Sequence, residues 1–469
     1  MNARPSVGLI LLRAEWFDSV VALPELVAGV AEDAAALSAA FPAELELRRT
    51  WMVNSPASLE TCTGELRTLR MDLVVLAFQV WAEDFYLQPI VEALAGQPLA
   101  VWCYQPSPRP PRPASFVEVL RYSGPVGTLE GLGTLRNLGA SFAFMAGAPG
   151  SPQFNAQLAA EARAGCACQG LRRARIGLLP ARNEQMQSTF VDEFRLRLDL
   201  GPQVVVLSVA DLERAARDVP PSELDAYLET LRSEIPVQGV RPETLARAAR
   251  ASLGLARLAQ DQRLDLLSFN DISAELHSAL GLRPCLFPPQ PEGRPGVLFG
   301  LEGDLGAATA MLVLDRLADS PLFFVEFWFW DEALNVLVGG HAGIQDPRLA
   351  RPGELFISRD YEYSQTDPTE GAHYQFACRP GRVTLLQVRW TPAGWQALSC
   401  AGEVVDAPPW IEGYPHAVIR PDLDVLDFFR QVAEAGSTQH WIMAYGDVLP
   451  GLRAWCRLAE VTLKDVSAP

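Results

Sequence analysis

The chain lacks the features that mark membrane-spanning and nucleic-acid-binding proteins. Its most hydrophobic run, residues 321–330, is interrupted by Glu326 and is shorter than the ~20 apolar residues that cross a bilayer. The 39 basic and 56 acidic side chains give a net charge of −17, which argues against a nucleic acid or an anionic membrane as partner. The apolar run 7–12 leads into charged residues without a cleavage signature, so we expect a cytoplasmic protein.

Cysteine pairs and nucleotide-binding glycine motifs are equally scarce. The eight cysteines are scattered, and the closest two, Cys166 and Cys168, have the wrong spacing for a CxxC zinc or redox site, so we expect mostly buried thiols. No GxGxxG or GxxxxGK(S/T) follows a predicted strand, which leaves nucleotide chemistry without support. HExxH and GxSxG are missing too, so neither a zincin nor a serine hydrolase is indicated.

What the chain does have is enough apolar sequence, 49% hydrophobic residues, for several domains of ~150 residues. Its hydrophobic pattern predicts two α/β domains, residues 1–168 and 169–295, the second ending in a proline-rich linker. Continuous apolar strands that alternate with helices are typical of parallel sheets covered on both faces, so each domain is predicted to be doubly wound. The strands are expected at 7–12, 45–51, 72–78, 97–104, 175–179, 203–208 and 264–269, with helices at 187–198, 222–234 and 242–262.

The pattern changes after residue 296. One helix is expected over 304–317, followed by short alternating segments separated by turns that contain glycine and proline. The region 296–469 is therefore predicted to be a mostly antiparallel, β-rich (α+β) domain. Its strands are expected at 323–329, 335–340, 353–358, 383–390, 394–398 and 441–445, with further helices at 423–435 and 449–458.

Two carboxylates in this last domain stand in unusual settings. Glu302 lies between glycines at a strand-to-helix turn, where a helix N-terminus stabilises negative charge; a plain helix cap by Asp304 explains the same pentapeptide. Glu326 stands alone among apolar residues of a predicted strand, and a buried carboxylate is costly unless it is paired or binds a cation. Alternation also allows Glu326 to share an exposed face with Trp328 and Trp330.

Four of the five histidines fall in the same domain, after residue 340. His341 ends a predicted strand between glycines, and His440 precedes another strand; either alone is more often structural. His373 and His416 have the setting of surface-loop residues, although His373 can border a pocket. Glu302, Glu326, His341 and His440 together offer imidazole and carboxylate without thiolate, which suits Mn²⁺ or another divalent cation with open water positions.

The order of these motifs resembles that of the L-fucose/L-arabinose isomerase family. The resemblance covers the chain from about residue 170 onward. It rests on Leu301–Asp304, Glu326 in an aromatic-rich strand, Asn335–His341, Pro380–Leu386, Gly436–His440 and Ala444–Asp447, with Arg175–Leu179 and Gly281–Cys285 in the middle segment. Departures from the family pattern, such as Gln439 where the arabinose type often has a second histidine, bear on the identity of the sugar.

The resemblance implies a metal-dependent aldose–ketose isomerase that works through a cis-enediol. Glu302, Glu326, His341 and His440 would be the metal ligands, and the two glutamates would also move the proton between C1 and C2. The resemblance further implies a homo-oligomer, a trimer or hexamer, in which neighbouring subunits share the sugar contacts.

The N-terminal domain supplies candidate sugar contacts after two of its strands. These are Arg13, Trp16, Gln79 and Trp81, because an arginine or an amide binds hydroxyl groups and tryptophan stacks on a sugar ring; packing in the core explains each tryptophan as well.

Two other functions fit the same residues. One is a non-catalytic carbohydrate-binding or sensory protein of the same fold, which binds a sugar without turnover. The other is a metallohydrolase that uses the same four ligands and incorporates solvent into a cleaved product.

Overall fold

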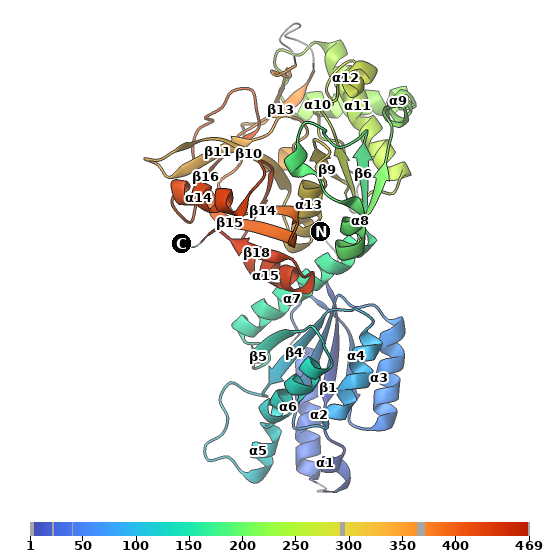
Figure 1. Cartoon of the computed structure of the whole chain (residues 1–469), viewed down its shortest axis with the longest axis vertical. Coiled ribbons are helices and arrows are strands. Elements are labelled where there is room, and N and C mark those ends of the chain that lie inside the picture. Colours follow the sequence, from blue (N-terminus) through green and yellow to red (C-terminus); the bar gives the residue numbers. More distant parts are fainter. Residues whose placement is uncertain (1–3, 21–22, 40, 291–295, 364–370, 468–469) are drawn as a thin grey trace. The chain divides into compact units, whose positions relative to one another are not determined.

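The computed structural model describes residues 4–20, 23–39, 41–290, 296–363 and 371–467, and it separates into two compact units (Figure 1). One unit comprises the residues up to Gln169 together with Pro450–Leu458. The other comprises Gly170–Leu449 together with the residues from Ala459 onward. Part of the predicted linker, residues 291–295, lies outside the described residues.

The first unit is built on a five-stranded parallel sheet. The strand order is β2-β1-β3-β4-β5, formed by β1 (Ser6–Leu12), β2 (Glu46–Val53), β3 (Leu73–Phe78), β4 (Leu99–Tyr104) and β5 (Ala143–Gly147). All six residues of β3 are buried, as the continuous apolar run predicts for a central parallel strand.

Alternate side chains of β1 enter two different hydrophobic clusters, so both faces of this sheet are covered. Leu9 packs with residues of α2 and α7, whereas Ile10 packs with residues of α3, α4 and α6. This arrangement is the doubly wound one. The helices of the unit are α1 (Trp16–Ser19), α2 (Pro24–Ala39), α3 (Pro56–Thr68), α4 (Leu87–Leu94) after the 3₁₀ turn Asp84–Tyr86, α5 (Phe116–Arg121), α6 (Gly124–Asn137), α7 (Pro152–Arg173) and α15 (Leu449–Leu458).

The second unit begins with a four-stranded parallel sheet of order β7-β6-β8-β9. Its strands are β6 (Arg175–Leu179), β7 (Gln203–Val206), β8 (Leu266–Phe269) and β9 (Leu298–Leu301), and its helices are α9 (Val209–Arg217), α10 (Pro221–Glu234), α11 (Pro242–Asp261), α12 (Ala274–Leu280) and α13 (Leu305–Leu317). The sequence placed Glu302 at a strand-to-helix turn, and β9 is the strand that this turn implies, although no bounds were predicted for it.

The helix predicted over 187–198 is wrong in part. The segment forms a 3₁₀ turn at Gln187–Thr189, a short α8 at Glu193–Arg195 and a π turn at Leu196–Leu200.

The remaining strands form a largely antiparallel sheet of order β14-β17-β10-β11-β16-β15-β18. Because β14 also pairs with β15, six of the seven strands close into a barrel, and β18 adds in parallel to β15. These strands are β10 (Leu322–Asp331), β11 (Val336–Gly340), β14 (Gly381–Thr391), β15 (Gly394–Val404), β16 (His416–Pro421), β17 (Trp441–Tyr445) and β18 (Thr462–Asp465). A two-stranded ribbon, β12 (Phe356–Ser358) with β13 (His373–Gln375), the 3₁₀ turn Pro347–Leu349 and α14 (Val425–Ala435) complete the unit.

The predicted mixed α/β architecture, with parallel sheets and a separate antiparallel β region, is confirmed at this level. The boundaries at 168 and 295 stay a prediction. Six of the eight cysteines are buried, as expected. Among the residues that the structure describes, no helix is long and apolar enough to cross a membrane.

The helix α14 covers one end of the barrel through its aromatic residues. Phe428 is fully buried and its ring lies 5.8 Å from that of Trp441 and 5.3 Å from that of Phe327. Trp441 directly follows His440, and Phe327 directly follows Glu326, so this aromatic cluster anchors the chain next to two of the candidate ligands.

We predict that Phe428→Ala destabilises the protein by about 3–5 kcal/mol, because it removes a large buried ring and leaves a cavity. Leu426→Ala, on the exposed side of the same helix, should change stability by no more than about 0.5 kcal/mol. Calorimetric unfolding of both variants measures the difference. Equal effects of the two substitutions would contradict the packing described here.

Candidate metal centre

Three adjacent strands of the barrel and the turn after β9 deliver the four residues that the sequence singles out as metal ligands. Glu326 lies within β10, opposite Gly340 of β11, and His341 follows β11 directly. On the other side of β10, Val325 pairs with Trp441 of β17, so His440 stands at the start of the adjacent strand. Glu302 comes from the turn after β9. Glu326 and His440, 114 positions apart in the chain, therefore meet because their strands are hydrogen-bonded side by side.

Two glycines allow the strands to approach closely at this point. A Cβ on Gly339 would lie 2.2 Å from the carbonyl oxygen of Glu326, and one on Gly340 would lie 2.0 Å from that of Pro415. Real Cβ atoms do not come so close, so larger residues would push β11 away from its neighbours. The glycine pair thus explains how His341 comes to lie beside the carboxylates.

Glu302 adopts a left-handed backbone conformation with φ of 57°, which is uncommon for a residue with a side chain. Gly303 continues it with φ of 66°. The backbone N–H of Glu302 donates to Oδ1 of Asp271 at 3.2 Å, and Asp271 is completely buried at the end of β8. Strain of this kind persists where the surroundings hold it in place, and it is found preferentially at functional sites.

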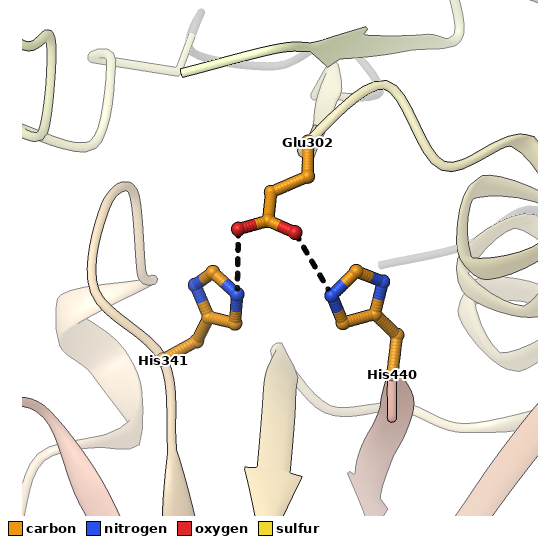
Figure 2. A group of neighbouring side chains, drawn as sticks. All are labelled: Glu302, His341 and His440. Atoms are coloured by element: carbon orange, nitrogen blue, oxygen red, sulfur yellow. Dashed lines mark ion pairs between the residues drawn. The ribbon is translucent and has the colours of Figure 1, made fainter. Parts of the chain in front are cut away.

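The carboxylate of Glu302 faces both imidazole rings, as Figure 2 shows. Its Oε1 lies 3.6 Å from Nε2 of His341, and its Oε2 lies 3.1 Å from Nε2 of His440. One ligand atom from each of the three residues lies within 4.8 Å of the others, and all three residues are buried. Phe324 packs its ring against both imidazoles, at 5.0 and 4.8 Å between ring centres.

Glu326 lies beside this group and is more accessible. Its Oε1 is 3.4 Å from Nε2 of His440, and its side chain is 27% exposed, against 8% for Glu302. Burial acts to raise the pKa of Glu326, but the neighbouring His440 and His341 outweigh it and hold the pKa below its ordinary value. Glu326 is therefore an ionised carboxylate that solvent or a substrate can reach.

The other imidazole nitrogens face acceptors outside the centre. Nδ1 of His440 lies 2.9 Å from Oδ2 of Asp304, and Nδ1 of His341 lies 2.6 Å from the carbonyl oxygen of Ala342. Burial acts to lower the pKa of His440, but the carboxylates of Asp304, Glu302 and Glu326 raise it well above its ordinary value. Both rings thus direct Nε2 toward the carboxylates.

The donor set fits a divalent metal ion. Oε2 of Glu302 and Nε2 of His440 are buried and face each other, yet among the described residues neither atom has a hydrogen-bond partner of acceptable angle. Buried polar atoms without partners are costly, and a cation between them would satisfy both. The group of Glu302, His341 and His440 can accordingly hold a metal ion, with Glu326 close enough to join it.

Asp271 was missed by the sequence analysis, although it lies two residues after the buried strand β8, at the edge where parallel sheets place functional residues. It links several parts of the site. Asp271 accepts from the backbone N–H of Glu302 through Oδ1, and its Oδ2 lies 3.8 Å from Nη1 of Arg283. Arg283 is a buried arginine that donates to Asp360 from both Nε and Nη2. Burial raises the pKa of Asp271 to about 6.

The expectation that His373 and His416 are surface-loop residues is wrong. Both are buried, with 0% and 1% exposure, because β13 and β16 carry them into the interior. Nε2 of His373 lies 3.1 Å from the side-chain nitrogen of Gln375, and burial lowers the pKa of His373 to about 4. The sequence could not show the burial of His373, since β13 has only three residues.

The four proposed sugar contacts of the N-terminal region lie in the first compact unit and follow β1 and β3. Arg13 is nearly buried and pairs with Asp18 at 2.7 Å, and Gln79 is buried and donates to the carbonyl oxygen of Val30. Trp16 is 42% exposed, and its ring centre lies 6.4 Å from that of Trp81. Their role toward a sugar stays a prediction.

The fold and the buried Glu/His/His group are those expected of a sugar isomerase, and comparison with known proteins supports this class. No protein-family model matches the chain. Curated relatives with the name sulfoquinovose isomerase align with most of it, which confirms the predicted enzyme class, an aldose–ketose isomerase or intramolecular oxidoreductase.

These relatives come from three bacteria. Those of Priestia aryabhattai and Priestia megaterium (strain ATCC 12872 / QMB1551) are each 23% identical over 425 residues, which cover 88% of this chain and 90% of the relative. The protein of Alkalicoccus urumqiensis is 22% identical over 436 residues, 88% of this chain and 92% of its own length. The similarity therefore extends through both compact units.

We predict that Mn²⁺ raises the melting temperature of the metal-free protein, because an ion that binds only the folded state stabilises it, by about 2.7 kcal/mol at 100 times Kd. Glu302→Gln should abolish this increase, since a neutral amide replaces the central carboxylate. Glu403→Gln, an exposed position on β15, should retain the full increase. Thermal unfolding with and without Mn²⁺ measures the effect, and an undiminished increase in the Glu302 variant would exclude this residue as a ligand.

Proposed function

We propose that the chain is a metal-dependent aldose–ketose isomerase of the L-fucose/L-arabinose isomerase kind that works through a cis-enediol. The observation that carries the proposal is the convergence of Glu302, His341 and His440, with the ionised and accessible Glu326 beside them. Such a group combines a cation site with carboxylates at one place, which is what moving a proton between neighbouring carbons of a sugar requires.

The three buried residues would hold the ion, with Glu326 as a fourth ligand, and Mn²⁺ or another divalent cation suits these donors. When bound, the cation polarises the carbonyl group of the sugar and stabilises negative charge on its oxygens. The protein prepares this site by facing both Nε2 atoms toward the carboxylates and by excluding water from Glu302 and the two rings.

The two glutamates are the proposed acid–base pair. Both lie within 3.4 Å of Nε2 of His440, one deeply buried and the other partly exposed. An ionised carboxylate at Glu326 can accept a proton from the carbon next to the carbonyl and return it to the neighbouring carbon. The environments of the two differ, which is typical of groups that divide acid and base roles.

Sulfoquinovose, the sugar in the relatives' names, is the first substrate to test, and its sulfonate makes it an anionic sugar. The predicted sugar contacts are Arg13, Trp16, Gln79 and Trp81. Trp16 is exposed and offers its ring to a sugar, whereas Arg13 is paired with Asp18 and Gln79 is buried. His373 is completely buried, and its proposed part in sugar binding stays a prediction. A trimer or hexamer and a cytoplasmic location stay predictions.

Deuterium incorporation tests the proposal. Samples of the protein loaded with Mn²⁺ are incubated in D₂O, each with one sugar: sulfoquinovose, D-glucose, L-fucose or L-arabinose. The ion is then removed with a chelator, and proton NMR spectra of the sugars are recorded. Deuterium at C2 of one aldose, together with formation of a ketose, is expected. Binding of a sugar without exchange would favour a sensory protein, and cleavage with solvent incorporation would favour a hydrolase.

Glu326→Gln should lower the exchange rate by about 10²–10⁴-fold, because the amide cannot accept the proton. Its melting temperature without metal should stay near that of the wild type, since the side chain is partly exposed. Glu332→Gln, in the exposed turn after β10, is the matched control and should exchange at the wild-type rate. Rapid exchange by the Glu326 variant would remove this residue from the acid–base pair.

A further inference from the structure

Asp304 connects the start of a helix with the candidate metal centre. Its Oδ1 accepts a hydrogen bond from the backbone N–H of Ala307 at 2.9 Å and caps α13, while its Oδ2 lies 2.9 Å from Nδ1 of His440. The residue is 3% exposed. The sequence explained Asp304 as a helix cap, and the structure adds the histidine contact.

The cap fixes the orientation of this carboxylate. The first N–H groups of α13 need an acceptor, and the helix N-terminus favours negative charge. Oδ2 is thereby left to face His440, and an ionised carboxylate can only accept a hydrogen bond, so the proton of this pair belongs to Nδ1.

We propose that Asp304 is a positioning residue that keeps Nε2 of His440 free to bind the metal ion. The inference rests on the metal site proposed above and adds to it a residue that does not touch the ion or the substrate. A carboxylate that accepts from the second nitrogen of a metal-binding histidine fixes both the tautomer and the orientation of the ring.

The two histidines of the centre both have an acceptor for a proton on Nδ1, but the acceptors differ in kind. In His341 the partner of Nδ1 is a backbone carbonyl, which no substitution removes. In His440 the partner is a side chain. The backbone of His440 is held separately, because the side chain of Gln387 donates to its carbonyl oxygen at 2.7 Å. Altering Asp304 should therefore change the tautomer and orientation of the His440 ring and leave the backbone of His440 in place.

Asparagine at this position separates the cap from the positioning role. In Asp304→Asn the carbonyl oxygen must stay on the side of Ala307, which donates to it. The amide NH₂ then faces Nδ1 of His440, and two donors cannot form a hydrogen bond. The imidazole avoids the conflict by carrying its proton on Nε2, where it can no longer bind a cation. The variant thus keeps the size and the cap of the aspartate.

The test is a titration of metal-free protein with Mn²⁺, followed by the EPR signal of the free ion. Asp304→Asn should weaken Mn²⁺ binding by about 10–100-fold. The matched control is Asp424→Asn, because Asp424 is exposed and caps α14 through the N–H groups of Leu426 and Asp427. The control should bind Mn²⁺ as the wild type does, with a similar melting temperature without metal.

Binding of Mn²⁺ by Asp304→Asn within twofold of the wild type would overturn the inference and leave the proposed function standing. If the wild type itself fails to bind Mn²⁺, the result contradicts both the proposed metal site and this inference.

A second measurement takes its result from the wild type and uses a variant only to assign signals. In the Zn²⁺-loaded wild type with ¹⁵N-labelled histidine, NMR should show a protonated Nδ1 and a metal-bound Nε2 for His440, assigned by the loss of its signals in His440→Gln. A proton on Nε2 would overturn the inference.

Discussion

The site depends on the mutual approach of buried carboxylates and imidazoles. Glu302 and His440 face each other at 3.1 Å in a part of the protein from which water is excluded. Taking such groups out of water costs several kcal/mol unless a partner of opposite charge compensates. A cation between Glu302, His341 and His440 supplies that compensation, and the surrounding contacts are arranged around this point.

The fold creates this approach by joining two kinds of sheet. The parallel sheet contributes the turn after β9, where Asp271 holds Glu302 in a left-handed conformation. The barrel contributes three adjacent strands, β11, β10 and β17, whose pairing sets the spacing between the remaining residues. Asp304 belongs to both parts, because it starts α13 and contacts His440. The centre is thus as rigid as the strands and the helix that carry it.

Much of this could be predicted from the sequence, and the failures have physical causes. Long apolar runs such as 72–78 show their strand in any context, and Glu326 is conspicuous because it interrupts one. The strand β13 has only three residues, too few to show a period, so His373 was placed on the surface. Asp271 and the contact between Asp304 and His440 depend on tertiary contacts across 31 and 136 residues of chain, which no local pattern reveals.

The most direct test of the account is a crystal of the protein grown with Mn²⁺, with diffraction recorded on both sides of the manganese absorption edge. We predict one anomalous peak, within bonding distance of Glu302 and of Nε2 in both His341 and His440. Density that lacks such a peak at saturating Mn²⁺, or that places the ion among other residues, would contradict it.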